Sequence, residues 1–468
     1  MVAMTHSYRY LRPSAADAAG GAVGLATSGG TTSRGPQPHP RFFSGVLTRP
    51  EAAARGLLAV AAVARTRYFR PQLAALRDPV VTCDGQRLRF ESFSACGGVH
   101  ARLDVLPGAL DGEVFDRGTT NVDVNDPLRE ALARVRRGDP LHLSVGADEL
   151  AVTTADGAVL EKKVPLPERW LRGFAELQVI SVPFDLRAEL PAAEAVRLLR
   201  SLPAGSGVLW MVPAGRTLRR SARPAPGAVA LAGARRLEVL TPLLRFARAL
   251  RVYGPPVSAA SLPVASAWEL ELPGMRLMLT LSPEVTRGFS GEGAVLDALV
   301  AYQAEADAEL VGALMDFEPA VETGELARLS GLPLPRVKAA LDRLGTAGRV
   351  GYDVAEAAYF HRELPYDAAG AERLNPRLRG ARALLAEGVV RLAEVPDTAA
   401  EDDAAARTAT VTMPDRAHRV RLTADGAALG CTCPWWSRYR GTRGKCKHAL
   451  AAELAARPGT PTRPGPND

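Results

Sequence analysis

Apolar residues recur at helical spacing in three stretches of the N-terminal half of the chain. Residues 50–69 carry alanine and leucine with this period, and Pro50 suits the first turn of a helix. The ranges 127–136 and 191–202 show the same spacing. The pattern therefore predicts three helices in this half.

Short alternating runs of apolar and polar residues predict a strand-rich region between residues 80 and 190. The predicted strands are 87–90, 101–105, 141–145 and 150–154, the last followed by a turn at Asp156 and Gly157. Residues 1–45 are mostly Gly, Ala, Ser, Thr and Pro, and we expect them to form an irregular N-terminal arm.

A helix followed by a β-hairpin occurs twice in the pattern. The first copy spans 128–153, and the second spans 243–281 with its helix over 243–251. This weak internal repeat predicts two α+β regions, 46–202 and 203–290.

Residues 291–365 combine three helical segments with two short strands. A helix is predicted over 296–314, Thr323 suits an N-cap, and Gly331 suits the tight turn before the next helix. That helix, 336–344, carries Val337, Ala340, Leu341 and Leu344 on one face, and strands over 349–352 and 358–361 follow it. The stretch resembles the winged-helix family.

The winged-helix resemblance implies two uses, DNA reading or docking of a protein. A DNA-reading unit would offer Arg336, Lys338 and Arg343 to the major groove or to phosphates. The whole unit is close to neutral because acidic residues offset the basic ones: Glu325, Asp342, Asp353 and Glu356. Both uses stay open.

The C-terminal part carries the clearest chemistry of the chain. A helix and an acidic linker are expected over 366–404, and strands over 408–413 and 418–423 precede a third strand that starts near residue 427. Four soft or borderline metal ligands then follow in the order Cys-x-Cys-x12-Cys-x-His: Cys431, Cys433, Cys446 and His448. Zinc takes such ligands in a tetrahedron.

The spacing of these ligands suits one metal ion. Residues i and i+2 of a strand point to the same side, so Cys431 and Cys433 can grip one ion together. In a helix they diverge by about 200°, so Cys446 must precede the last helix or lie in its first turn, with His448 just inside. Four protein ligands leave no position for a reacting water, which indicates one structural Zn²⁺.

At this point residues 405–457 resemble the SWIM-type zinc finger family, whose signature is CxCx(n)CxH between a β-hairpin and a helix. The resemblance implies zinc binding by the four residues named above, and binding of DNA or of proteins. The chain is similar to bacterial SWIM proteins without a fused catalytic domain. Some of these accompany MoxR-type ATPases and von Willebrand A proteins.

The charge of the chain gathers in the same region. Residues 405–457 carry ten basic and three acidic residues, so their net charge equals the +7 of the whole chain. The loop between the ligand pairs mixes aromatic with basic residues, and its candidates for nucleic-acid contact are Arg438, Tyr439, Arg440, Arg443, Lys445 and Lys447. The alternative interpretation is a solvated basic surface without a partner. Only five of the 58 basic residues are lysine, so arginine is enriched along the whole chain. Trp435 and Trp436 offer a small core, and we expect one of the two to serve it.

Composition excludes several classes of protein. The chain has 468 residues, enough for about three domains, and 47% of them are apolar. Its most apolar stretch, 56–64, is far shorter than the about 20 residues of a membrane span. We expect no signal peptide, since no basic-then-apolar stretch is present at the start, and five cysteines, an odd number, predict a reducing cytoplasm without disulfides. His100, His142, Cys83 and Cys96 stand alone, and no P-loop or catalytic set is evident.

We therefore predict an α+β multidomain protein of the cytoplasm with no enzymatic activity. It would have a strand-rich N-terminal region, a winged-helix-like unit over 291–365, a C-terminal ββ(β)α SWIM zinc finger over 405–457, and a disordered tail over 458–468. The expected partner is nucleic acid, DNA rather than RNA. The alternative is an adaptor whose zinc module docks an acidic protein; we expect neither a membrane nor a small-molecule substrate.

Overall fold

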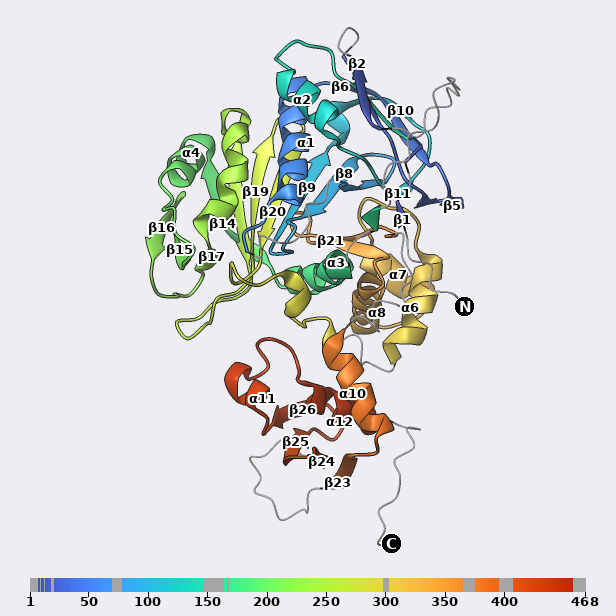
Figure 1. The fold of residues 1–468 in the computed structure, drawn as a ribbon, viewed down its shortest axis with the longest axis vertical. Helices are drawn as coiled ribbons and strands as arrows, with labels where there is room; N and C mark the ends of the chain where they lie inside the picture. Colours follow the sequence, from blue (N-terminus) through green and yellow to red (C-terminus); the bar gives the residue numbers. More distant parts are fainter. Residues whose placement is uncertain are drawn as a thin grey trace.

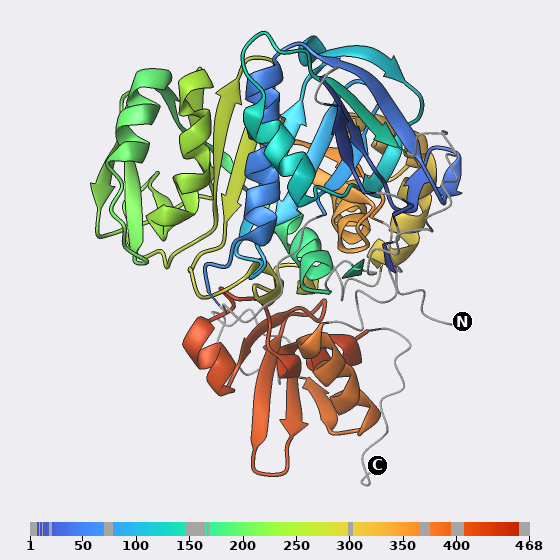
Figure 2. The same ribbon diagram turned by 45° about the horizontal axis from the view of Figure 1, so that its top comes forward.

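The computed structural model of the chain describes residues 7–8, 10–11, 13–17, 21–69, 78–146, 164–165, 168–297, 303–364, 375–394 and 407–457. We call residues 7–297 the body, 303–364 the helical unit, and 375–457 the C-terminal module. The C-terminal module lies at one end of the molecule, below the other two in Figures 1 and 2. Within the described ranges, no helix is long and apolar enough to cross a membrane.

A ten-stranded antiparallel sheet forms the centre of the body. Its spatial order is β14-β18-β19-β20-β9-β8-β7-β11-β4-β5, so strands far apart in sequence become neighbours. The bounds are β4 (Gly30–Thr32), β5 (Gly35–Gln37), β7 (Val80–Cys83), β8 (Leu88–Phe93), β9 (Val99–Val105), β11 (Gly118–Asn121), β14 (Asp185–Pro191), β18 (Ala249–Gly254), β19 (Ser266–Leu272) and β20 (Met275–Leu281).

One face of this sheet is apolar and carries the largest core. A row of residues in register crosses the sheet and is buried throughout: Leu190, Leu250, Leu270, Leu277, Leu103, Phe90 and Val81. Helix α1 (Pro50–Arg65) packs on this face beside the 3-10 helix η2 (Ala234–Phe246). A side chain at Gly56 of α1 would meet Leu103 Cδ1 at 2.9 Å, so glycine permits this close approach.

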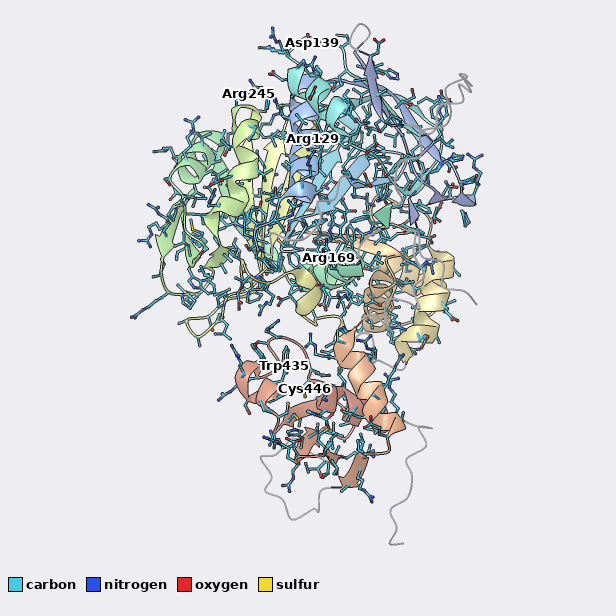
Figure 3. All side chains as sticks on the ribbon, viewed as in Figure 1. Arg129, Asp139, Arg169, Arg245, Trp435 and Cys446 are labelled. Atoms are coloured by element: carbon cyan, nitrogen blue, oxygen red, sulfur yellow. The ribbon has the colours of Figure 1, made fainter. Side chains whose placement is uncertain are left out.

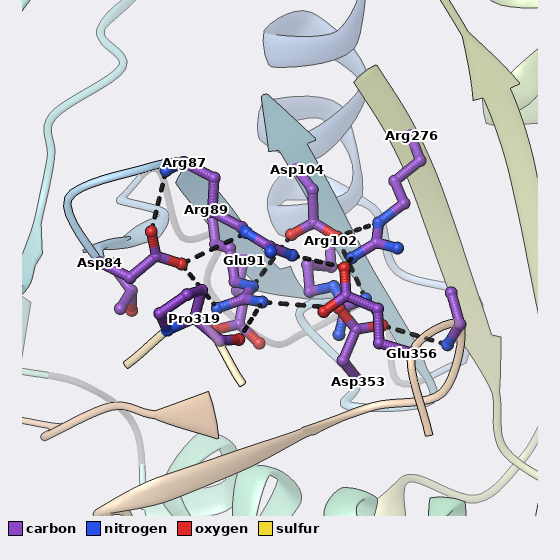
Figure 4. A network of polar contacts seen from close by, with 12 residues as sticks. Asp84, Arg87, Arg89, Glu91, Arg102, Asp104, Arg276, Pro319, Asp353 and Glu356 are labelled. Carbon is purple, nitrogen blue, oxygen red and sulfur yellow. Dashed lines mark hydrogen bonds and ion pairs between the residues drawn. The ribbon is translucent and has the colours of Figure 1, made fainter. Parts of the chain in front are cut away.

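Part of the opposite face of the sheet is charged, and a hairpin of the helical unit covers that part. Arg102 Nη2 contacts Asp353 Oδ1 of the hairpin at 2.7 Å, and Arg362 Nη1 contacts Glu91 at 2.9 Å. Arg276 also bonds to Asp353 (Figure 4). The side chains of Arg102, Asp353, Arg362 and Glu91 are buried, and that of Arg276 is 11% exposed. The body and the helical unit are thus joined through buried ion pairs.

Smaller sheets and helices complete the body. A five-stranded sheet has the order β10-β6-β12-β3-β2, and a three-stranded sheet has the order β16-β15-β17. Their bounds, with those of the paired strands β1 and β13 and the remaining helices, are β1 (Ser7–Tyr8), β2 (Ala15–Asp17), β3 (Ala22–Leu25), β6 (Arg41–Leu47), β10 (Leu110–Val114), β12 (His142–Gly146), β13 (Val164–Pro165), β15 (Val208–Ala214), β16 (Thr217–Ser221), β17 (Val229–Ala232), α2 (Asp126–Arg134), α3 (Glu168–Ser181), α4 (Ala192–Arg200), η1 (Pro107–Ala109) and η3 (Phe289–Gly291).

The helical unit has three helices followed by a hairpin. These are α6 (Gln303–Leu314), α7 (Thr323–Ser330), α8 (Leu334–Thr346), β21 (Val350–Asp353) and β22 (Ala358–His361). The predicted apolar face of α8 is buried, and Gly331 ends α7 with φ +69°, as a tight turn requires. The N-cap of α7 is Glu322 rather than the expected Thr323, and it makes no side-chain cap bond.

The C-terminal module is a four-stranded sheet with helices on one face. The sheet order is β23-β24-β25-β26, and α10 packs against α12 on its covered side. The bounds are α10 (Pro376–Ala386), β23 (Val390–Glu394), β24 (Arg407–Thr412), β25 (Ala417–Leu422), β26 (Ala428–Cys431), α11 (Pro434–Tyr439) and α12 (Lys447–Ala455). Val420 and Leu422 point inward, as predicted from their alternation.

Two predicted boundaries in the N-terminal half are wrong. The arm expected over 1–45 contains strands β2 to β6 in its described part, because short Gly- and Thr-rich segments pair with distant strands. The division between 46–202 and 203–290 is also wrong, since the ten-stranded sheet takes strands from both ranges. The repeat fails with it: residues 249–251, expected in a helix, belong to strand β18.

The predicted boundary at residue 405 is wrong as well. Helix α10 and strand β23 precede it and yet belong to the C-terminal module, since β23 pairs with β24 through residues 390–394. The strand expected over 150–154, the turn at Asp156 and Gly157, the linker 396–406 and the tail 458–468 lie outside the described residues.

Candidate metal centre

The four predicted ligands meet at one end of the module sheet. Cys431 ends β26, Cys433 is the N-cap of α11, Cys446 is the N-cap of α12, and His448 lies in the first turn of α12. All four are buried, and their ligand atoms lie within 4.8 Å of one another. This is the only such group of metal-binding side chains found in the described part of the chain. Cys446 is labelled in Figure 3.

The local backbone explains how two thiols are held. Cys433 Sγ accepts the backbone N–H of Trp436 at 3.4 Å, and Cys446 Sγ accepts that of Ala449 at 3.3 Å. Each sulfur therefore takes the place of the side-chain oxygen that normally caps a helix. Unpaired N–H groups at a helix start favour negative charge, so both positions favour thiolates.

The residues present fit a zinc ion. His448 is only 7% exposed, and neither of its ring nitrogens makes a hydrogen bond to the described part of the chain. A buried polar atom without a partner is costly, and a metal ion supplies one. Three thiolates and an imidazole form the closed tetrahedral set of structural zinc sites. The imidazole of His418 covers the site, with its ring centre 4.4 Å from that of His448.

The metal ligands belong to the core of the module rather than to a surface cleft. The buried cluster around them includes Val420, Leu450 and Leu384, together with Leu296 of the body. Zinc would therefore fix the two helix starts and the end of β26 to one core. A bound ion of this kind supplies folding free energy directly.

The loop between the ligand pairs is organised around Trp435. The guanidinium of Arg377 in α10 lies 4.9 Å from its ring centre, and that of Arg443 lies 5.3 Å from it. Trp435 Nε1 donates to Gly444 O at 3.3 Å, and Arg377 donates to Lys445 O at 3.2 Å. Trp435, labelled in Figure 3, thus links α10 to the loop just before Cys446. Both tryptophans are half-buried, so neither alone forms the core.

The predicted nucleic-acid residues fall into two groups. Arg438 and Arg440 are exposed on and after α11, and Tyr439 is half-buried between them. Arg443, Lys445 and Lys447 are half-buried instead.

The second group is held by contacts within the protein. Arg443 donates to Gly291 O at 3.2 Å, and Lys445 Nζ pairs with Asp297 at 2.9 Å and with Glu453. Lys447 lies along Gly380 of α10. These residues join the module to the body and to itself, which the sequence did not indicate.

The structure adds a second set of basic residues that the loop-based hypothesis missed. Arg391, Arg419 and Arg421 lie exposed on the uncovered side of the module sheet. Alternation in the stretch 417–422 carried the signal for two of them, because inward Val420 and Leu422 imply outward Arg419 and Arg421. Arg391 had no such signal, since its strand lies before the expected boundary.

The isolated histidine and cysteines of the body are buried and serve the fold. Cys83 and Cys96 are buried, and burial raises the pKa of the Cys83 thiol to about 12. His100 lies 3.2 Å from Glu91, and burial lowers the pKa of its imidazole. None of the three belongs to a metal-binding group of the described residues.

A closed Cys3His set on one strand end and two helix starts defines a structural zinc finger. Residues 418–457 match the family model of the SWIM zinc finger. The chain thus carries a SWIM zinc finger, which binds one structural zinc ion through Cys431, Cys433, Cys446 and His448, and this prediction is confirmed.

Whole-chain comparisons add little to this assignment. No curated protein sequence matches the chain. Among solved structures, the chain is similar to the proliferating cellular nuclear antigen of Entamoeba histolytica, with 11% identity and a TM-score of 0.32 over 52% of this chain and 100% of that one. At this TM-score the likeness carries no argument about fold or function.

Proposed function

We propose that the protein is a non-enzymatic nucleic-acid-binding protein whose C-terminal module, with its zinc site, contacts the nucleic acid. The observation that carries the proposal is the concentration of charge, ten basic against three acidic residues over 405–457. Arg438 and Arg440 are exposed there. No ion pair joins either of them to the described part of the chain, so both are available to phosphates.

General arginine enrichment explains this surface poorly, because the body treats its arginines differently. On its charged sheet face, Arg251 contacts Glu189, Glu269 and Glu271 within 3.2 Å. Arg276 likewise contacts Asp104 at 2.8 Å. At these two positions, acidic neighbours neutralise the arginines. The zinc module carries an excess instead.

We propose that the helical unit is a winged-helix-like scaffold rather than the DNA reader. Its order of three helices and a hairpin supports the resemblance, as does the bridge between Val321 and Tyr359. The hairpin that would act as a wing is held against the body by the ion pairs of Figure 4. Arg336 forms two hydrogen bonds to Asp307, at 2.6 and 2.8 Å. These contacts hold the hairpin and pair Arg336 with an acidic residue, whereas Lys338 of α8 stays exposed.

The absence of enzymatic activity is part of the proposal. Four protein ligands close the zinc site, so a bound ion has no position at which to activate water. The buried carboxylates of the body, such as Glu91 and Asp353, are paired with arginines and hold the fold together.

One observation favours a second candidate function, a protein-interaction adaptor. The loop of the zinc module presents Arg438 and Arg440 beside Tyr439, and arginine and tyrosine are enriched among residues that dominate protein interfaces. An acidic protein surface would suit the same charge. A partner from a MoxR-type ATPase or von Willebrand A system belongs to this candidate, whereas a cytoplasmic location belongs to both candidates.

Binding to labelled DNA and RNA across a salt series tests the proposal. Each phosphate contact on a duplex contributes about −0.9 to the slope of log K against log salt. Replacing Arg438 and Arg440 together with alanine should flatten that slope by about 1.5–2 units while zinc content stays unchanged. The control, Arg134→Ala with Arg197→Ala, removes two exposed arginines of the body that have acidic partners. Wild type that binds no nucleic acid at low salt, yet retains a protein from nuclease-treated lysate, would support the adaptor.

A further inference from the structure

The uncovered side of the module sheet is a flat basic surface. We call it the open sheet face and define it by Arg391, Thr408, Thr410, Thr412, Arg419 and Arg421. The alternate residues of the same strands, among them Ala409, Val411, Val420 and Leu422, are buried under α10 and α12. Helices therefore cover one side, and the described part of the chain leaves the other open.

The register of the strands sets the spacing of the arginines. Arg391 pairs with Thr410, which pairs with Arg419, so the two arginines lie on one cross-strand row two strands apart. Strand spacing puts their backbones about 10 Å apart. Arg421 lies about 7 Å from Arg419 along the same strand and on the same side.

No acidic residue occupies the described register positions of Arg391 and Arg419, because both of them pair with Thr410. Opposite charges across a strand pair stabilise a sheet, so a purely structural surface would be expected to carry them. The body sheet follows that rule and the open sheet face departs from it.

An aromatic side chain borders the open sheet face. A Cβ atom at Gly430 would lie 3.8 Å from Arg421 Nε and 3.8 Å from Trp436 Nε1. The side chains of Trp436 and Arg421 therefore both lie next to the backbone of Gly430. Beyond Trp436, helix α11 carries the exposed Arg438, and the exposed Arg440 is its C-cap.

We propose that the open sheet face binds single-stranded nucleic acid, with the sugar-phosphate backbone over Arg391 and Arg419 and an unpaired base on Trp436. A sheet of four strands is about 14 Å wide before its side chains are counted, and the major groove is about 12 Å wide. The face cannot enter that groove. A single strand can follow a flat basic surface and stack its bases on aromatic rings.

This inference rests on the proposed function, and one set of binding measurements separates the two. The probes are a labelled oligonucleotide without secondary structure and a duplex of the same length, both measured with zinc-loaded full chain. With about −0.7 per contact on single strands, contacts from Arg391, Arg419, Arg438 and Arg440 predict a slope of about −3. Arg391→Ala with Arg419→Ala should reduce it to about −1.5. The lysine double variant should restore it, because phosphate binding needs charge alone.

The outcomes differ for the two proposals. Single-strand binding that is tighter than duplex binding, and that is weakened by the Arg391 and Arg419 variants but not by the Arg134 and Arg197 control, supports the inference. If wild type binds but those variants behave as the control does, or if duplex binds more tightly, the inference is overturned while the proposed function stands. Wild type that binds neither probe at low salt overturns both.

Discussion

The carboxylate of Asp353 gives the strongest prediction about how the helical unit is held on the body. Asp353 is 1% exposed and contacts Arg102 at 2.7 Å and Arg89 at 3.5 Å, and it also bonds to Arg276. The change is Asp353→Asn, which keeps the volume of the side chain and removes its charge. Three buried guanidinium groups would then share less negative charge.

The free energy of unfolding that Asp353→Asn should lose follows from the burial of this ion pair. Removing one partner of a buried ion pair costs about 3–5 kcal/mol. Arg102 and Arg276 keep Asp104 as a partner, at 3.1 and 2.8 Å, so the lower end, about 3 kcal/mol, is expected. The control is Glu356→Gln in the same network, whose side chain is 30% exposed. A partly exposed pair of this kind contributes about 0–1 kcal/mol.

The stabilisation by Asp353 should depend on pH with a definite sign. Burial raises the pKa of Asp353, but Arg102, Arg276 and Arg89 outweigh it and hold that pKa well below its usual range. Because the pKa is lower in the folded state, the stabilisation is present above the unfolded pKa of about 3.9 and is lost as pH falls below it. The asparagine variant should lack this loss in acid.

Native-state hydrogen exchange measures the effect where it should occur. The amides of β21 and β22 should open with about 3 kcal/mol less free energy in Asp353→Asn, and with at most about 1 kcal/mol less in Glu356→Gln. Equal effects of the two variants would refute the claim that buried ion pairs fix the hairpin to the body.

Two further predictions concern the metal and a second buried carboxylate. Purified protein should hold about one equivalent of zinc, and this content should fall towards zero in Cys433→Ser. Chelation should remove the hydrogen-exchange protection of the amides of the C-terminal module, α10 and β23 included, while the ten-stranded sheet stays protected. Full zinc retention in the variant, or loss of protection confined to residues after 405, would contradict this. Burial raises the pKa of Glu176 to about 7 although it accepts the backbone N–H groups of residues 293–295. The contribution of Glu176 to the free energy of unfolding should therefore be largest below pH 4 and fall by about 3 kcal/mol up to pH 7. In Glu176→Gln, the free energy of unfolding should depend less on pH in that window.

Local patterns predicted the metal site because its spacing constrains geometry directly. The placement of Cys446 and His448 at a helix start needed only neighbouring residues. The buried face of α8 and the two strands that follow it were found for the same reason. Cys431 and Cys433 were expected on one strand, but β26 ends at Cys431 and Cys433 instead caps α11.

Long-range pairing is what the sequence could not supply. Strands β4 and β5 have three residues each, too few for an alternating pattern, and they exist because β11 offers an edge. The acidic run after residue 396 suggested a domain boundary, yet β23 lies before it and pairs with β24. Lys445 looked like a phosphate contact until Asp297 and Glu453 were found beside it, since ion pairs depend on distant residues.

Ultraviolet cross-linking of zinc-loaded full chain to a single-stranded oligonucleotide, followed by mass spectrometry of the linked peptides, tests the central claim most directly. We predict links within 417–440, the stretch that carries β25 with Arg419 of the open sheet face, Trp436, and the exposed Arg438 and Arg440. Aromatic side chains that stack on bases lie closest to the cross-linking partner. Links confined to α8 and the hairpin β21–β22, or no links above those of a chelator-treated sample, would contradict the assignment of nucleic-acid binding to the zinc module.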